Sequence, residues 1–173
     1  QVTLTAQSNN GKQLLPYLQT HVQNCSAELV EDTLTLTYNE VASDIDEASK
    51  LVADNAFSAL RSCINSIKST TDNPFSVFLG GVFAYDMVAN FESLSDVPDG
   101  ENSCPDYVFY LAETLVVIDH QAKTTELIGN VFNGPDVHAN CFEVGQQLER
   151  LNAVCDKAKS YQGQKQTGSN PIS

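Results

Sequence analysis

The chain has 173 residues, 42% of them hydrophobic and 18% charged, and its formal net charge at pH 7 is −13. This length suits one domain with a proper hydrophobic core, or one part of a larger domain. The negative charge argues against nucleic acids and anionic membranes as partners. No apolar run is long enough to span a membrane, and the N-terminus lacks the basic-then-apolar pattern of a signal peptide.

The start of the chain resembles the middle of a domain. It begins with Gln1, and residues 2–6 alternate between apolar and polar as in a half-buried strand. The Asn-Asn-Gly sequence at 9–11 predicts a turn, and residues 12–21 predict a short helix in which Pro16 is tolerated only in the first turn. We therefore expect a fragment of a longer polypeptide.

Two short strands and a long helix are predicted next. Residues 27–30 and 33–38 read as strands joined by a two-residue turn. A helix is expected over 46–68, where Asp44 and Glu47 form an aspartate version of the capping box. Its apolar residues recur at spacings of three and four: Ala48, Val52, Ala56, Leu60, Cys63 and Ile67.

The middle of the chain predicts more strands. Residues 75–82 predict a strand and 85–91 a short helix, and the Ser-, Asp-, Pro- and Gly-rich stretch 92–104 predicts a loop. The run 106–119 is too long for one flat strand, so we expect a bend or bulge near Glu113.

A hairpin and a helix should complete the domain. Residues 125–132 are expected to pair with the preceding strand, and a helix should begin near Pro135, which suits a first helical position. From about residue 160 the chain is polar and predicts a linker, so 1–159 would be the domain and 160–173 the linker. Strands clustered around helices without strict β-α-β alternation predict an α+β fold with a largely antiparallel sheet.

The five cysteines predict a reduced, cytoplasmic protein. Cys63, Cys141 and Cys155 fall on predicted apolar helix faces, where a thiol behaves as a small hydrophobic group. The odd number, the absence of a close CxxC pair and the scattered histidines argue against a zinc site.

Two segments near the middle carry candidate chemistry. Gly80-Gly81 lacks the spacing of a phosphate-binding loop, and a tight strand-to-helix junction is the favoured interpretation. Tyr85 and Asp86 begin the predicted short helix, where Asp86 would favour the positive end of the helix dipole. The functional alternative is a polar contact that holds this segment against a missing domain.

Acids and histidines elsewhere give no catalytic set. Glu113 interrupts an apolar run, so it needs a partner from the backbone, from a hydroxyl or from outside this chain, and an interdomain contact is the functional interpretation. Asp119-His120 invites a catalytic-triad reading, but neighbours on a strand point to opposite faces, so a strand end is favoured. His21 and His138 read as exposed helix residues.

Basic residues are missing from one long segment. Between Lys68 and Lys123 there is no lysine or arginine, while nine acids occur there. A solvated acidic face is the favoured interpretation. The alternative is a surface for a basic partner, either another subunit or the rest of the same polypeptide.

Two motifs provide a resemblance to a known family. FLGGVFAYDMVANFE at 78–92 and CPDYVFYLAETLVVIDHQ at 104–121 resemble the first half of anthranilate synthase component I, the chorismate-using large subunit. The second motif is closer to this family than to its sibling, aminodeoxychorismate synthase component I, which shares the first element. The resemblance implies an α+β N-terminal domain.

The resemblance also implies an activity for the full-length protein. It is that of a cytoplasmic lyase of tryptophan biosynthesis, which converts chorismate and ammonia into anthranilate and pyruvate with Mg²⁺ and is inhibited by tryptophan. The ammonia would come from glutamine through component II, a glutamine amidotransferase subunit. In this family the chorismate and Mg²⁺ residues lie in a C-terminal half beyond Ser173, and the LLES-like motif of the tryptophan site is missing.

We therefore assign no catalytic, cofactor-binding or metal-binding residue to this chain and expect it to be inactive alone. Three other readings remain open: a fragment of aminodeoxychorismate synthase component I, a non-enzymatic acidic interaction module, and a hydrolase built on Asp119-His120.

Overall fold

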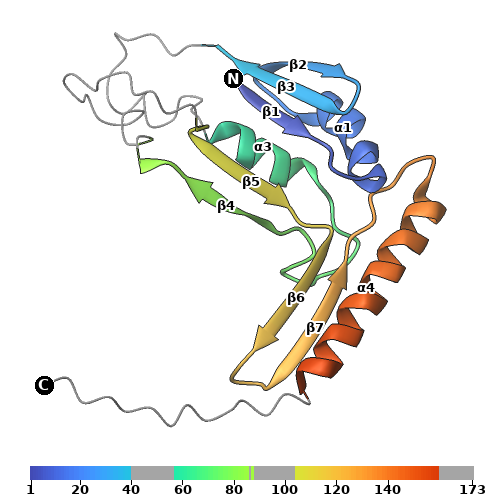
Figure 1. The fold of residues 1–173 in the computed structure, drawn as a ribbon. Helices are drawn as coiled ribbons and strands as arrows, with labels where there is room; N and C mark the ends of the chain where they lie inside the picture. The colour runs from blue at the N-terminus through green and yellow to red at the C-terminus, as the bar shows by residue number, and fades with distance from the viewer. Residues whose placement is uncertain (40–56, 86, 88–103, 160–173) are drawn as a thin grey trace, which may run out of the picture.

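The computed structural model describes residues 1–39, 57–85, 87 and 104–159 (Figure 1). Within them it contains three α-helices and seven β-strands, all paired antiparallel. The elements are β1 (Val2–Thr5), α1 (Asn9–His21), β2 (Cys25–Val30), β3 (Thr33–Tyr38), α3 (Ser58–Ser66), β4 (Leu79–Phe83), β5 (Tyr107–Leu111), β6 (Thr114–Asp119), β7 (Thr124–Gly129) and α4 (Val137–Lys159). This confirms the predicted α+β class.

The first sheet has the order β1-β3-β2, with β3 in the centre. Alternation in Thr33–Tyr38 points Leu34 and Leu36 to one side, where both side chains are fully buried. Glu31 has a φ of 52°, and its left-handed backbone allows the predicted two-residue turn between β2 and β3.

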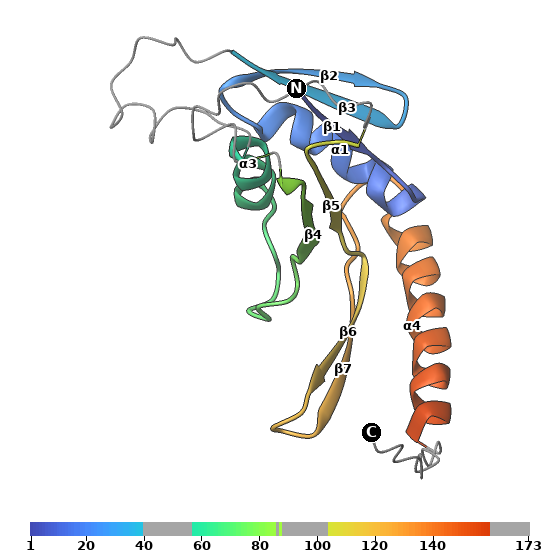
Figure 2. The ribbon, with the colours of Figure 1, turned by 60° about the vertical axis from the view of Figure 1, so that its left-hand side comes forward.

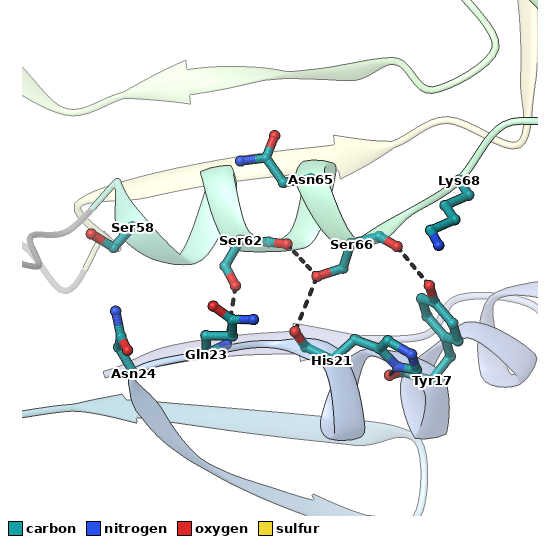
Figure 3. Close-up of a pocket in the computed structure, with 9 residues that line it drawn as sticks. All are labelled: Tyr17, His21, Gln23, Asn24, Ser58, Ser62, Asn65, Ser66 and Lys68. Carbon is teal, nitrogen blue, oxygen red and sulfur yellow. Dashed lines mark hydrogen bonds between the residues drawn. The ribbon is translucent and has the colours of Figure 1, made fainter.

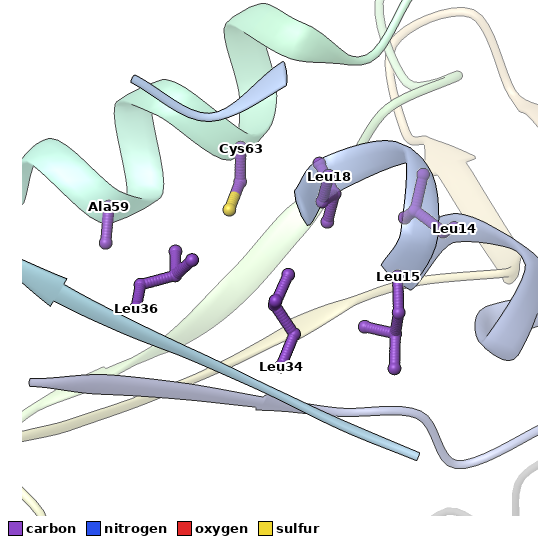
Figure 4. Close-up of a cluster of buried hydrophobic side chains, with 7 residues drawn as sticks. All are labelled: Leu14, Leu15, Leu18, Leu34, Leu36, Ala59 and Cys63. Atoms are coloured by element: carbon purple, nitrogen blue, oxygen red, sulfur yellow. The ribbon is translucent and has the colours of Figure 1, made fainter. Parts of the chain in front are cut away.

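The main core lies between this sheet, α1 and α3 (Figure 4). Its buried side chains come from three segments of the chain: Leu14, Leu15, Leu18, Leu34, Leu36, Ala59 and Cys63. The leucines of α1 recur at helical spacing, so they form one face that packs on the sheet. The described part of the predicted helix over 46–68 is α3, and its earlier residues, including the capping box, lie outside the described residues.

The predicted long strand at 106–119 is broken at Ala112 and Glu113. β5, before the break, pairs with β4, and β6, after it, pairs with β7. The expected bend is confirmed, but it separates two sheets instead of bending one. Figures 1 and 2 show β6, β7 and α4 extending away from the first sheet.

α4 packs along the β6-β7 hairpin by a narrow stripe. Asn140 and Val144 are buried, and Leu148 and Leu151 are half-buried. Cys141, predicted for this stripe, is exposed. It lies about 100° around the helix from Asn140, beyond the line along which α4 meets the hairpin.

The turn predicted at 9–11 is wrong. Ser8 is the N-cap of α1, and the helix begins at Asn9, so the Asn-Asn-Gly sequence forms its first turn. As a result Pro16 lies inside the helix and not in its first turn. The proline is exposed, and because it has no N–H, the carbonyl of Lys12 lacks its usual helical donor.

Candidate functional site

The first turn of α1 is attached to the break between β5 and β6. The Ser8 hydroxyl accepts a hydrogen bond from the Gly11 N–H, at 2.8 Å, and donates one to the carboxylate of Glu113. The predicted need of Glu113 for a partner is therefore met by a hydroxyl of this chain. Its side chain supports the helix start, where a carboxylate also favours the helix dipole.

Asn10 extends this connection into the interior. Its side chain is buried, donates to the Asn130 carbonyl and accepts from the Phe132 N–H, each at 2.8 Å. Asn130 in turn donates through its own side chain to the Ala112 carbonyl at 3.1 Å. A polar network therefore joins α1, the β5-β6 break and the segment after β7, and every bond in it is structural.

The sequence interpretation missed Ser8 and Asn10 because the Asn-Gly pair was taken as a turn. A serine directly before an apolar helical pattern is the N-cap signal that would have found the helix start.

A polar pocket of about 390 Å³ lies between the end of α1 and α3 (Figure 3). Its walls carry hydroxyl, amide and basic groups from both helices and the turn after α1: Tyr17, His21, Gln23, Asn24, Ser58, Ser62, Asn65, Ser66 and Lys68. His21 stacks on Tyr17 with a centroid separation of 3.8 Å, and both His21 and His138 are exposed, as predicted.

The hydroxyl groups of this pocket hold the two helices together. The Tyr17 hydroxyl donates to the Ser66 carbonyl at 2.7 Å, and the Ser66 hydroxyl donates to the His21 carbonyl at 3.4 Å. The His21 ring nitrogen Nδ1 lies 2.8 Å from the Tyr17 carbonyl and 2.9 Å from the Thr20 hydroxyl. The His21 ring is paired with its own helix and not with Ser62 or Ser66, so this geometry gives no support to a serine–histidine nucleophile.

Asp119 and His120 form a strand end, as predicted. One carboxylate oxygen of Asp119 accepts hydrogen bonds from the Gln121 and Ala122 N–H groups, at 2.8 and 2.9 Å. The carboxylate therefore stabilises the hairpin turn between β6 and β7. His120 is exposed, and the geometry gives no support to a catalytic triad.

Gly80 and Gly81 lie inside β4, not at a strand-to-helix junction. A Cβ at Gly81 would lie 2.1 Å from the Val108 carbonyl oxygen on β5, so the expected close backbone approach is real. Tyr85 is 91% exposed, and Asp86 lies outside the described residues. Of the acidic segment, Glu113 and Asp119 have partners within the chain, which removes them from any free acidic face.

The second hollow is an apolar groove of about 820 Å³ between β1 and β5, with α1 and α3 beneath it. Burial raises the pKa of the Cys63 thiol, at its floor, to about 11, with a smaller contribution from Cys25. Burial also raises the pKa of Tyr107. Both side chains are thus protonated at neutral pH, and Cys63 lacks the lowered pKa of a reactive cysteine.

The described residues contain no group of three or more His, Cys, Asp or Glu side chains that could hold a metal ion, and none of their helices could span a membrane. No protein-family model matches the chain. Curated proteins, however, match it over most of its length.

These relatives are named anthranilate synthase component 1, and three of them illustrate the match. The protein from Vibrio cholerae is 45% identical over 139 residues, which is 79% of this chain and 26% of the relative. That from Vibrio parahaemolyticus is 38% identical over 91% of this chain and 29% of its own length. That from Salmonella typhimurium is 39% identical over 88% of this chain and 28% of its own length.

This chain belongs to the anthranilate synthase component I family. It spans less than a third of the length of these relatives. The resemblance inferred from the motifs at 78–92 and 104–121 is confirmed at the level of the family. The second motif supplies β5, Glu113 and β6, so it contains the carboxylate that joins this part of the structure to Ser8.

Proposed function

We propose that this chain is part of the N-terminal scaffold and regulatory domain of an anthranilate synthase component I. The full-length polypeptide would convert chorismate and ammonia into anthranilate and pyruvate in the cytoplasm, as a lyase of tryptophan biosynthesis. The observation that supports this is the identity of 38–45% to three proteins of that name over most of the chain.

In this proposal residues 1–159 are the partial domain and 160–173 a polar linker toward the chorismate-binding half. Component II, a glutamine amidotransferase, would supply ammonia from glutamine, and tryptophan would inhibit the full-length enzyme. The Ser8 hydroxyl caps a helix, the Asp119 carboxylate stabilises a turn, and the Tyr17 hydroxyl joins two helices. A scaffold that is inactive alone is consistent with these roles.

The family implies Mg²⁺, and the described residues do not fit it. Mg²⁺ favours carboxylate oxygens in octahedral geometry, and the described residues offer no group of three or more His, Cys, Asp or Glu side chains. Glu113 and Asp119 are used in structural hydrogen bonds at separate places in the fold. We therefore assign no part of a magnesium site to these residues and derive no reaction step through the ion.

The test uses the full reading frame that contains this chain. The purified product is supplied with chorismate, Mg²⁺ and ammonium, and the products are identified by fluorescence and mass. Anthranilate together with pyruvate is the expected result, and glutamine should replace ammonium only when component II is present. The 173-residue chain is assayed in parallel and should leave chorismate unchanged.

Three results would contradict the proposal. Aminodeoxychorismate as the product would place the protein with the sibling enzyme. Unchanged chorismate, under conditions in which a relative is active, would favour the acidic interaction module. Turnover by the 173-residue chain alone would overturn the scaffold role.

A further inference from the structure

The groove between β1 and β5 lies between two sheet edges. β1 is an edge strand in the order β1-β3-β2, and β5 is an edge strand in the order β4-β5. Both strands line the groove, and apolar side chains of α1 and α3, among them Leu14, Leu18 and Ile64, also line it. Figure 1 shows β1 and β5 running in the same direction.

Hydrogen bonds beside β1 show which backbone groups point into the groove. The Ala6 N–H donates to the Asp32 carbonyl at 2.9 Å, which continues the register of β1 with β3. The backbone N–H and C=O groups of successive residues point to opposite sides of a strand. Those of Leu4 therefore also point to β3, while those of Thr3 and Thr5 point away from it. The structure records no hydrogen bond for the backbone groups of Thr3 and Thr5 among the residues that it describes.

The same reasoning applies to β5. The Ala84 N–H donates to the Asp106 carbonyl at 2.7 Å, and the Ala112 N–H donates to the Phe78 carbonyl at 3.0 Å. Both pairs continue the β4-β5 register. The backbone groups of Val108 and Tyr110 therefore point to β4, whereas those of Phe109 and Leu111 point to the groove.

Neither edge strand carries a charge or a proline of the kind that protects a free edge. Natural edges are blunted by lysine, proline, a bulge or an inward-pointing charge. β1 reads VTLT and β5 reads YVFYL, without charge or proline in either strand. Two unprotected edges that border one apolar groove are suited to a strand between them.

We propose that an extended segment of the same polypeptide, from outside residues 1–173, occupies this groove and pairs with both β1 and β5. Since β1 and β5 run in the same direction, one strand antiparallel to β1 is also antiparallel to β5. The two sheets would then become one antiparallel sheet in the order β2-β3-β1-inserted strand-β5-β4. This mode of binding is β-strand addition at an open edge.

The length of the relatives argues for this occupant. The chain covers 26–29% of three of them, so a protein of their length has several hundred further residues to supply a strand. The segment needs apolar residues at alternate positions, because one of its faces would lie on α1 and α3. The inference rests on the proposed function only in requiring a longer polypeptide, and not on chorismate chemistry.

The test is amide hydrogen exchange in the full-length protein without chorismate. The amides of Thr3, Thr5, Phe109 and Leu111 should exchange at least about 100-fold more slowly than that of Leu29, because they would lie in a closed ladder. Leu29 is the matched control, since β2 pairs only with β3 and the Leu29 amide points away from that partner.

A pair of variants tests the contact itself. Thr5→Pro removes the donor that faces the groove and none of the donors that face β3, and a free edge tolerates proline at such a position. In the full-length protein it should therefore return the Phe109 and Leu111 amides toward the rate of Leu29, while Thr5→Val should leave them protected.

Rapid exchange of all four amides would overturn the proposal. So would protection that depends on protein concentration and accompanies dimers in sedimentation, because the occupant would then be a second copy. The chorismate assay is independent of these readouts, so failure of either hypothesis can be recognised separately.

Discussion

The Ser8 hydroxyl donates a hydrogen bond to the carboxylate of Glu113, a residue 105 positions later in the chain. The same oxygen caps α1 by accepting from the Gly11 N–H. One side chain therefore fixes the start of α1 and ties it to the break between β5 and β6. This polar connection is one of the links between the helix that covers the first sheet and the strand that leads into the β6-β7 hairpin.

Replacement of Ser8 by alanine should lower the free energy of unfolding by about 1–3 kcal/mol. It removes the cap of α1 and leaves the half-buried Glu113 carboxylate without this donor. Urea unfolding followed by circular dichroism measures the change. Thr20→Ala is the control, because its exposed hydroxyl contacts only nearby groups of the same helix. Equal effects of the two variants would show that the Ser8–Glu113 contact carries no particular weight.

Replacement of Asn10 by alanine should cost about 2 kcal/mol or more. The Asn130 carbonyl and the Phe132 N–H each lose a partner in the interior, where an unsatisfied polar group costs about 1–3 kcal/mol. The neighbouring Asn9→Ala is the matched control, since Asn9 is exposed in the same turn of α1. A loss of stability below about 0.5 kcal/mol for Asn10→Ala, measured by the same unfolding experiment, would contradict the role of this network.

Local patterns predicted most of the described elements but not how they join. The alternation in Thr33–Tyr38 and the spacing of the α1 leucines depend on near neighbours, so both were found from the sequence. The first turn of α1 was missed because Asn-Gly favours a hairpin turn locally, and the contacts that hold it helical come from Glu113 and Asn130. Such contacts between distant parts of the chain leave no periodic signal.

The candidate site shows the same division. The need of Glu113 for a hydroxyl or other partner followed from its place in an apolar run, but its identity as Ser8 did not. The exposure of Cys141 was missed because both it and Asn140 lie close to the apolar stripe, and only the position of the hairpin decides which is covered. The family followed from two motifs, since identity at many positions carries more information than any single residue.

Gly81→Ala and Gly145→Ala should have opposite effects. At Gly81 a Cβ would meet the Val108 carbonyl oxygen at 2.1 Å, and this backbone atom cannot move without breaking the β4-β5 ladder, so a loss of more than about 2 kcal/mol is expected. At Gly145, in α4, a Cβ meets nothing within 4 Å, so alanine should stabilise the helix by about 0.5–1 kcal/mol. Thermal unfolding of both variants measures whether each substitution raises or lowers the stability. A neutral Gly81→Ala would show that β4 and β5 are not this close.

Cys63 should resist alkylation in the folded protein, because its side chain is only 9% exposed and burial raises its pKa to about 11. At pH 8 iodoacetamide should modify the exposed Cys141 at least about tenfold faster, and the difference should vanish in urea. Mass spectrometry of the digested protein measures the alkylation of each cysteine. Equal alkylation of Cys63 and Cys141 in the native protein would contradict burial of the Cys63 thiol in the core.

The same thiol predicts a loss of stability in alkali. Its pKa is higher in the folded chain than the ordinary 9.0, so the folded state holds the proton more tightly. The contribution of the protonated thiol to the free energy of unfolding is therefore complete below pH 9 and is lost as the pH rises through about 11. Cys63→Ala should be less stable at pH 7 because of the cavity, yet show a shallower decline of stability between these pH values. An equally steep decline of stability in Cys63→Ala would show that this thiol does not cause the loss in alkali.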